Sequence, residues 1–242
     1  MTTIRYTTAF LALGLASCSL QKIAAPAPPT AFLVSSGADT SGKIARLPFD
    51  HSWKNASVDL SQYKHIILHP VTTAYLRKDQ WVESYSNFIP TREAYVKQGE
   101  GLARFWTASL KRAFSSPDCS LEFTDSTAQP GTLVLEVALT EVTYGRPAGY
   151  AGSMAIPGGS LVNSAAASPV AAFEARLKDA ATGKLVATVA DRRGTRLKII
   201  DFNQLTYTKA NEEICNEWSR QLMQATNKEL FPKVKRTWFS AF

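Results

Sequence analysis

The strongest constraint on the fold is the segment 132–143, TLVLEVALTEVT, in which large apolar residues alternate with others. Leu133, Leu135, Val137 and Leu139 are two positions apart, so they share one face of an extended chain. This period of two predicts a strand with one buried and one exposed side. The segment therefore predicts a sheet that is covered on one face.

A second alternating segment covers residues 170–179, and residues 185–190 predict its partner strand. The connection between them is short, and Gly183 suits the positive φ that tight turns need. We therefore predict an antiparallel hairpin with one face toward water. The charges at Asp179 and at Asp191-Arg192-Arg193 are interpreted as turn chemistry and local ion pairing, with a recognition patch as the alternative.

Two segments have a helical period instead. In residues 91–114 and 208–230 the apolar residues recur every three or four positions, which predicts amphipathic helices. Thr91 can cap the first helix, and Pro232 stands just beyond the second. The stripes consist of Tyr95, Leu102, Trp106 and Leu110 in the first helix and Ile214, Trp218, Leu222 and Ala225 in the second.

The remaining elements are weaker. Residues 63–71 predict a buried strand that ends at a bend, and residues 121–123 predict a short strand. Residues 32–58 predict an irregular arm, with Phe49 and Trp53 as its anchors on the core.

Together these elements predict an α+β fold, with a mostly antiparallel sheet of about four to five strands and two amphipathic helices packed on one face. About 210 residues follow the N-terminal leader, which is enough for one domain with a sizeable core. We therefore expect a single domain over residues 32–242.

The first 17 residues have the pattern of a bacterial lipoprotein signal peptide. Arg5 gives a basic start, residues 9–15 are apolar but too short to cross a bilayer, and Leu15-Ala16-Ser17 precede Cys18 as the lipoprotein signal peptidase requires. We expect a mature chain that begins at an acylated Cys18, held in the lipid bilayer by palmitate-type chains. An ordinary secretory signal cut nearby is the alternative, and both lead to export.

Residues 18–31 predict an Ala/Pro tether that favours polyproline II over helix and holds the domain off the membrane. Ser19 follows the cysteine. This position resembles that of other bacterial lipoproteins that are sorted to the outer membrane. We expect the periplasmic face of the outer membrane.

Charge and cysteines add two expectations about the exported domain. The net charge of +7 is spread along the chain, so it indicates a solvated surface, with attraction to anionic envelope lipids as the alternative and nucleic acid excluded as a partner by export. Cys119 and Cys215 predict a disulfide in an oxidising compartment. The alternative is that Cys215 is a small buried apolar residue and Cys119 a surface thiol.

Two segments are candidates for contact with a partner. Residues 145–168 are rich in Gly, Ala, Ser and Pro, which predicts a long mobile loop that orders on binding. The C-terminal tail combines bases with aromatics, and a partner or membrane contact there competes with a final strand or a lid on the core. The tail residues in question are Lys233, Lys235, Arg236, Trp238 and Phe239.

The sequence does not predict an enzyme. His51, His65 and His69 are the only histidines, and neither zinc nor calcium-loop spacing occurs, so we expect no metal and no cofactor. The glycine-rich stretch 156–160 lacks the Gly-Lys-Ser ending of a phosphate loop, and no Gly-x-Ser-x-Gly elbow is present.

Short motifs are scattered between residues 50 and 224, namely Asp59-Leu60-Ser61, Tyr63-Lys64, His69-Pro70-Val71, Asp79-Gln80-Trp81, residues 131–143, Glu174-Ala175-Arg176 with Asp179, Thr182-Gly183-Lys184, Asp191-Arg192-Arg193 and Glu217-Trp218. In combination they resemble the bacterial lipoprotein family known as domain of unknown function 3313. The resemblance implies an envelope lipoprotein without an established activity, cofactor or catalytic residue, and the arm 32–46 departs from the family pattern. The order of elements is also similar to that of periplasmic auxiliary lipoproteins of lipid transport, which is an analogy of fold.

These observations predict a membrane-anchored periplasmic lipoprotein that serves as a non-enzymatic docking or scaffolding module for an envelope protein or lipid partner. The first alternative is an auxiliary subunit of an envelope lipid or solute transport system, which predicts an apolar cleft between helices and sheet. An envelope hydrolase and a structural lipoprotein that binds the cell wall are further alternatives.

Overall fold

The computed structural model describes residues 25–77, 92–124, 130–143, 170–194 and 207–227. A six-stranded sheet runs through the described part of the chain in the order β1-β6-β5-β4-β2-β3. The elements are α1 (Ala31–Val34), β1 (His51–Lys54), the 3-10 turn η1 (Leu60–Gln62), β2 (His65–Leu68), α2 (Arg92–Phe114), β3 (Glu122–Phe123), β4 (Thr132–Thr143), β5 (Val170–Asp179), β6 (Leu185–Gly194) and α5 (Tyr207–Thr226).

The antiparallel part of the sheet confirms the strongest predictions. β4 pairs with β5 and β5 with β6, so that Leu135 lies opposite Leu177 and Leu177 opposite Ala187. Gly183 has a φ of 68° in the predicted turn, where Asp179 accepts hydrogen bonds from the amide and hydroxyl of Thr182. β6 runs four residues beyond the predicted end at residue 190, because residues 191–194 still pair with residues 170–173 of β5.

The rest of the sheet corrects the predicted fold. β2 pairs in parallel with both β3 and β4, so the sheet is mixed and has six strands, where we predicted a mostly antiparallel sheet of four to five. A parallel pair needs a long crossover between its strands, and α2 supplies it between β2 and β3. Alternation along one strand does not reveal the direction of its neighbour, which explains the difference.

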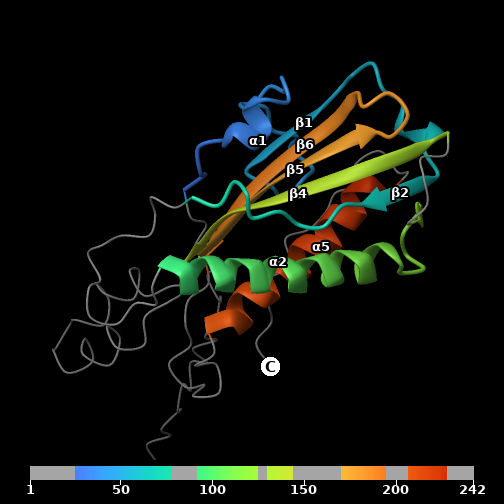
Figure 1. Cartoon of the computed structure of the whole chain (residues 1–242). Coiled ribbons are helices and arrows are strands. Elements are labelled where there is room, and N and C mark those ends of the chain that lie inside the picture. Colours follow the sequence, from blue (N-terminus) through green and yellow to red (C-terminus); the bar gives the residue numbers. More distant parts are fainter. Residues whose placement is uncertain (1–24, 78–91, 125–129, 144–169, 195–206, 228–242) are drawn as a thin grey trace, which may run out of the picture.

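Both predicted amphipathic helices form and lie on the same face of the sheet, while α1 lies on the opposite face (Figure 1). Trp106 of α2, Trp218 of α5 and Phe173 of β5 meet in the middle of this layer, with ring centroids 4.7 to 5.3 Å apart. All three are at most 1% exposed. Burial of such large side chains contributes most of the free energy that holds helices and sheet together.

The N-terminal arm is more regular than predicted. Residues 51–54 form the edge strand β1, and residues 31–34 form one turn of helix that Thr30 caps by accepting from the amide of Phe32. Phe49 is fully buried, as expected of an anchor, whereas Trp53 is only half-buried. Short edge elements of this kind depend on the strand beside them, so their own sequence carries little signal.

Candidate functional site

The face of the sheet opposite α2 and α5, here called the outer face, carries charged side chains in its centre. Glu141 is fully buried and accepts two hydrogen bonds of 2.7 Å from the guanidinium of Arg192 on β6. These bonds outweigh the cost of burial and raise the pKa of Arg192. A two-pronged arginine–carboxylate pair of this kind is strong and fixed in direction.

A second ion cluster continues the outer face toward the hairpin turn. Glu136 bonds to Arg176 at 2.7 Å and to Lys178 at 2.9 Å. Burial alone would raise the pKa of Glu136, but the hydrogen bond from Lys178 and the charge of Arg176 act more strongly and hold it below its ordinary value. The two clusters give this face a pattern of fixed charges.

Residues 25–34, here called the strap, lie against these charges. The amide and the hydroxyl of Thr30 donate to the two carboxylate oxygens of Glu174, both at 2.6 Å, and Glu174 is only 3% exposed. Arg192 donates to the carbonyl of Ala25 at 3.3 Å, and Arg77 donates to the carbonyl of Pro28. The end of the predicted tether is therefore bound to the domain, because its backbone meets these charged side chains.

The C-terminal half of the strap adds apolar contacts to this polar attachment. Phe32 and Leu33 are at most 2% exposed and pack on Ala138 of β4. The guanidinium of Arg176 lies 3.9 Å from the ring centroid of Phe32 and donates to its carbonyl at 3.0 Å. Tyr75 closes the other side of that ring, edge-on at 5.2 Å. One turn of helix is thereby held by both cation–π and apolar contacts.

A buried polar network ties α5 to β6 on the helix side of the sheet. Asp191 accepts from the indole of Trp218 at 2.8 Å and pairs with Arg193 at 2.6 Å. Arg193 donates to Gln221, which donates in turn to Glu217, each at 2.6 Å. Turn chemistry is therefore the wrong interpretation of Asp191-Arg192-Arg193, because these residues lie inside β6, but the local ion pairing that it included is present between Asp191 and Arg193.

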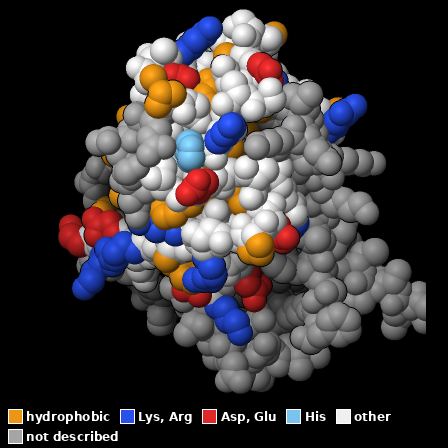
Figure 2. All heavy atoms as spheres, turned by 90° about the vertical axis from the view of Figure 1, so that its right-hand side faces the viewer, with side chains coloured by type: hydrophobic (Ala, Val, Ile, Leu, Met, Phe, Trp, Pro, Cys, Tyr) orange, Lys and Arg blue, Asp and Glu red, His pale blue; other side chains and the backbone are white. Residues whose placement is uncertain are grey.

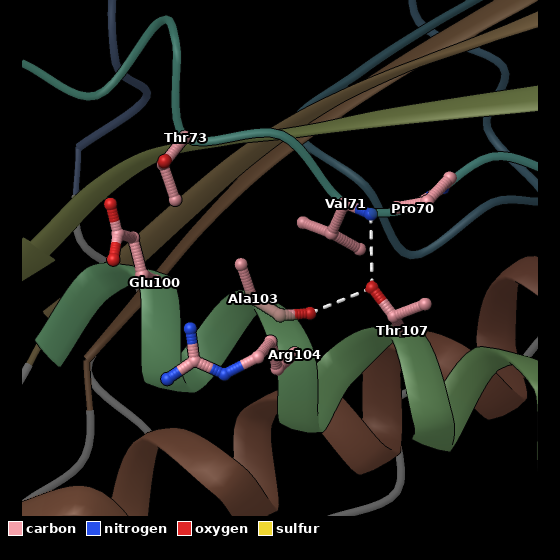
Figure 3. Close-up of a pocket in the computed structure, with 7 residues that line it drawn as sticks. All are labelled: Pro70, Val71, Thr73, Glu100, Ala103, Arg104 and Thr107. Atoms are coloured by element: carbon pink, nitrogen blue, oxygen red, sulfur yellow. Dashed lines mark hydrogen bonds between the residues drawn. The ribbon is translucent and has the colours of Figure 1, made fainter. Parts of the chain in front are cut away.

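The described residues leave small hollows between elements of the fold. A shallow hollow of about 300 Å³ lies between α2 and the chain after β2, where the amide of Val71 donates to the hydroxyl of Thr107 (Figure 3). A second hollow of about 230 Å³ lies beside the strap and is lined by His51, Asp50 and Glu174 among others. The polar groups of Val71 and Glu174 that border these hollows are already hydrogen-bonded within the protein. Such pairing is typical of polar groups with a structural role.

The predicted disulfide is wrong, since Cys119 and Cys215 are free thiols. The amide of Ser120 donates to Asn227, so Cys119 lies beside the end of α5. Cys215 precedes Asn227 by twelve residues, or about 18 Å along a helix, and a disulfide needs Cα atoms within about 7 Å. Cys215 is fully buried, as its alternative interpretation expected, and Cys119 is half-buried.

The histidines have separate surroundings. His65 lies 3.5 Å from Glu122, and His69 lies 4.0 Å from Glu136. His51 lies 3.2 Å from the hydroxyl of Thr188, and burial lowers its pKa. Within the described residues no group of three or more His, Cys, Asp or Glu side chains is arranged to hold a metal ion.

Several predicted site residues lie outside the described part of the chain. These are the lipidation site Cys18, the loop 145–168 and the tail residues Lys233, Lys235, Arg236, Trp238 and Phe239. Among the helices that are described, none combines the length and the apolar character needed to cross a bilayer. The strap was not predicted as a site, because the motif Glu174-Ala175-Arg176 does not indicate which segment its side chains bind.

Comparisons with known proteins complete the description. The PelC dodecamer from Paraburkholderia phytofirmans is 11% identical, with a TM-score of 0.37 over 71% of this chain and 96% of that one. Protein XCC0632 from Xanthomonas campestris, assigned to DUF330, is 12% identical, with a TM-score of 0.40 over 72% of this chain and 89% of that one. No curated protein matches the chain. The family described as "Protein of unknown function (DUF3313)" matches residues 47–222, and the chain belongs to this family.

Proposed function

We propose that this chain is a lipoprotein anchored through acylated Cys18 at the periplasmic face of the outer membrane, and that its domain is a non-enzymatic docking module for an envelope protein or lipid component. The observation that carries the proposal is the bonding of Thr30 to Glu174. A tether that serves only as a spacer needs no buried carboxylate to receive it. The attachment of the segment that follows the lipidation signal suggests that the position of the anchor relative to the domain matters.

The layer between helices and sheet also supports docking over transport. A transport subunit that carries an apolar molecule there needs an open cleft. In this chain Trp106, Trp218 and Phe173 pack against one another in that layer and are at most 1% exposed. An apolar ligand would have to displace these side chains, so surface docking is the function that the described geometry favours.

Metabolic labelling tests the anchor. Cells that express the full chain are fed an alkyne analogue of palmitate, and the purified protein is probed for the label. We expect label on the wild type and on Cys119→Ser, which is the matched cysteine control, but none on Cys18→Ala. An unlabelled wild type, or label that persists in Cys18→Ala, would contradict lipid anchoring.

Cross-linking in intact cells tests the docking role. The full chain is cross-linked, purified and analysed by mass spectrometry, with Cys18→Ala as the unanchored control. We expect a reproducible set of envelope proteins that is lost in Cys18→Ala. The same set in both samples would show that docking does not depend on the anchor, and a sample without attached protein would favour a lipid or cell-wall ligand.

A further inference from the structure

The strap crosses the outer face in a defined direction. Ala25 is bonded to Arg192, Thr30 to Glu174, and Phe32 to Arg176. Arg192 lies opposite Ala172 near the end of β6, and Arg176 lies opposite Thr188, nearer the hairpin turn. Glu174 lies between Ala172 and Arg176 on β5, so the strap passes these three side chains in order from the end of β6 toward the turn. Ala25, the first described residue of the strap, therefore lies toward the end of the sheet where β4 and β6 finish (Figure 1).

This direction has a consequence for the distance to the anchor. Seven residues, 19–25, join Cys18 to the bound end of the strap. A fully extended chain spans at most 3.3–3.6 Å per residue, so Ala25 can lie no more than about 25 Å from the acylated cysteine. With the strap detached as far as Gly42, 24 residues would intervene and the reach would rise to about 85 Å.

We propose that the strap orients the domain on the membrane, so that the end of the sheet where β4 and β6 finish faces the lipid surface at short range and the β5–β6 turn points away from it. The proposal rests on the lipid anchor proposed above. The bound state is favoured because detachment would break the two hydrogen bonds from Thr30 to the carboxylate of Glu174 and would expose Phe32 and Leu33 to water.

The charges at the end of the molecule that carries the β5–β6 turn fit a surface that faces away from the membrane. Figure 2 shows it with basic and acidic side chains interspersed. Such a mixed surface lacks the single sign of charge by which basic patches bind anionic head groups. The exposed residue Ala181 lies in the β5–β6 turn, at this end. The exposed residue Ala74 lies nearer the other end, because its neighbours Thr72 and Arg77 contact the second half of β4, at Ala138 and Thr140.

Energy transfer in vesicles measures this orientation. The full acylated chain, with Cys119→Ser, is labelled with a donor at Ala74→Cys or Ala181→Cys and inserted into phosphatidylethanolamine and phosphatidylglycerol vesicles that contain an acceptor lipid. The two sites differ by roughly 20 Å along the strands. We expect clearly stronger transfer from Ala74→Cys than from Ala181→Cys, and equal transfer, or the reverse order, would overturn the proposal.

Two further variants separate the strap from the anchor. Thr30→Ala with Phe32→Ala detaches the strap, and an insertion of twelve Gly and Ser residues before Ala25 lengthens the leash outside the described fold. The double variant should abolish the difference between the two sites, and the insertion should lower transfer from both. Val34→Ala is the matched control, since Val34 is 61% exposed in the same helical turn.

Each outcome has a distinct meaning. If the difference persists in the double variant with its circular dichroism unchanged, the strap does not orient the domain. If the insertion leaves energy transfer from both sites unaltered, the length of chain between Cys18 and the strap does not set the distance between domain and membrane. This result holds even if the double variant fails to fold. If the wild-type chain is not acylated and does not bind vesicles, the proposed anchor is wrong, and the orientation that rests on it is overturned with it.

Discussion

The indole of Trp218 donates a hydrogen bond of 2.8 Å to Asp191, and through it α5 is bound to β6 in a place closed to water. Trp218 is fully buried and Asp191 is 3% exposed. Arg193 pairs with the same carboxylate at 2.6 Å, so one acidic group satisfies both a neutral donor and a cation. This buried carboxylate therefore joins the second helix to the sheet in addition to the aromatic packing around Trp218.

Asp191→Ala should lower the free energy of unfolding by about 3–5 kcal/mol, because it leaves the buried guanidinium of Arg193 without its carboxylate. The control Glu122→Ala removes an exposed partner of His65 and should cost less than about 1 kcal/mol. Urea denaturation of the full chain measures both changes. A loss for Asp191→Ala that equals that of the control would contradict the structural importance of this carboxylate.

Gly131 and Gly183 form a matched pair for a test of backbone constraint. Both have a positive φ, of 73° and 68°, so Ala at either position costs about 1–2 kcal/mol in backbone strain. At Gly131 a Cβ would also lie 2.9 Å from the carbonyl oxygen of Gln62, whereas nothing lies within 4 Å at Gly183. Gly131→Ala should therefore be the more destabilising variant in urea denaturation, and equal losses would count against the close approach of Gln62.

Tyr63 should make stability depend on pH under alkaline conditions. Burial and the hydrogen bond of its hydroxyl to Asp179 raise the pKa of Tyr63 to about 12 from its ordinary value of 10.0. The folded protein thus retains this proton longer than the unfolded chain, so the contribution is complete below pH 10 and is lost as the pH rises toward 12.

The measurement compares the wild type with Tyr63→Phe, which has no proton to lose at this position. The difference in free energy of unfolding between the two should be constant below pH 10 and should shrink above it. Absorbance of tyrosinate reports the ionisation directly. A difference that stays constant up to pH 11.5 would indicate an ordinary pKa for Tyr63 in the fold.

The two cysteines should behave as separate thiols of different reactivity. Burial raises the pKa of both, and raises that of the fully buried Cys215 well above the ordinary value. In the native protein an alkylating reagent should modify Cys119 slowly and Cys215 not at all, and unfolding without reductant should expose both to modification. Mass spectrometry counts the added groups, and a requirement for reductant would instead reveal a disulfide.

Prediction from sequence succeeded where a pattern is local. The alternation in β4 and β5 and the three- and four-residue spacing in α2 and α5 located these elements within a few residues, because burial of one face imposes its period on the sequence. It failed where the outcome depends on a distant partner. The strand β1 is an example, since its four residues become a strand only by pairing with β6.

The candidate site shows the same division. The Ala/Pro composition of residues 18–31 predicted an extended segment, and residues 25–30 do lack helix and strand, but composition alone does not reveal that Glu174 and Arg192 receive the end of that segment. These residues are more than 140 positions away from Thr30 and Ala25 along the chain. Only the pairing of β4, β5 and β6 brings their side chains onto one face.

The sequence by itself determined the two long helices and the long strands of the sheet, which of their faces are apolar, and that a Cys18 lipidation pattern stands at the start of the chain, because these follow from periodicity and from short contiguous motifs. Only the tertiary structure decided that β2 runs parallel to its neighbours, that Cys119 and Cys215 are too far apart to pair, and that the strap is bound to the outer face. The physical reason is that each of these depends on the distance between residues far apart in the chain, which strand pairing and helix packing set.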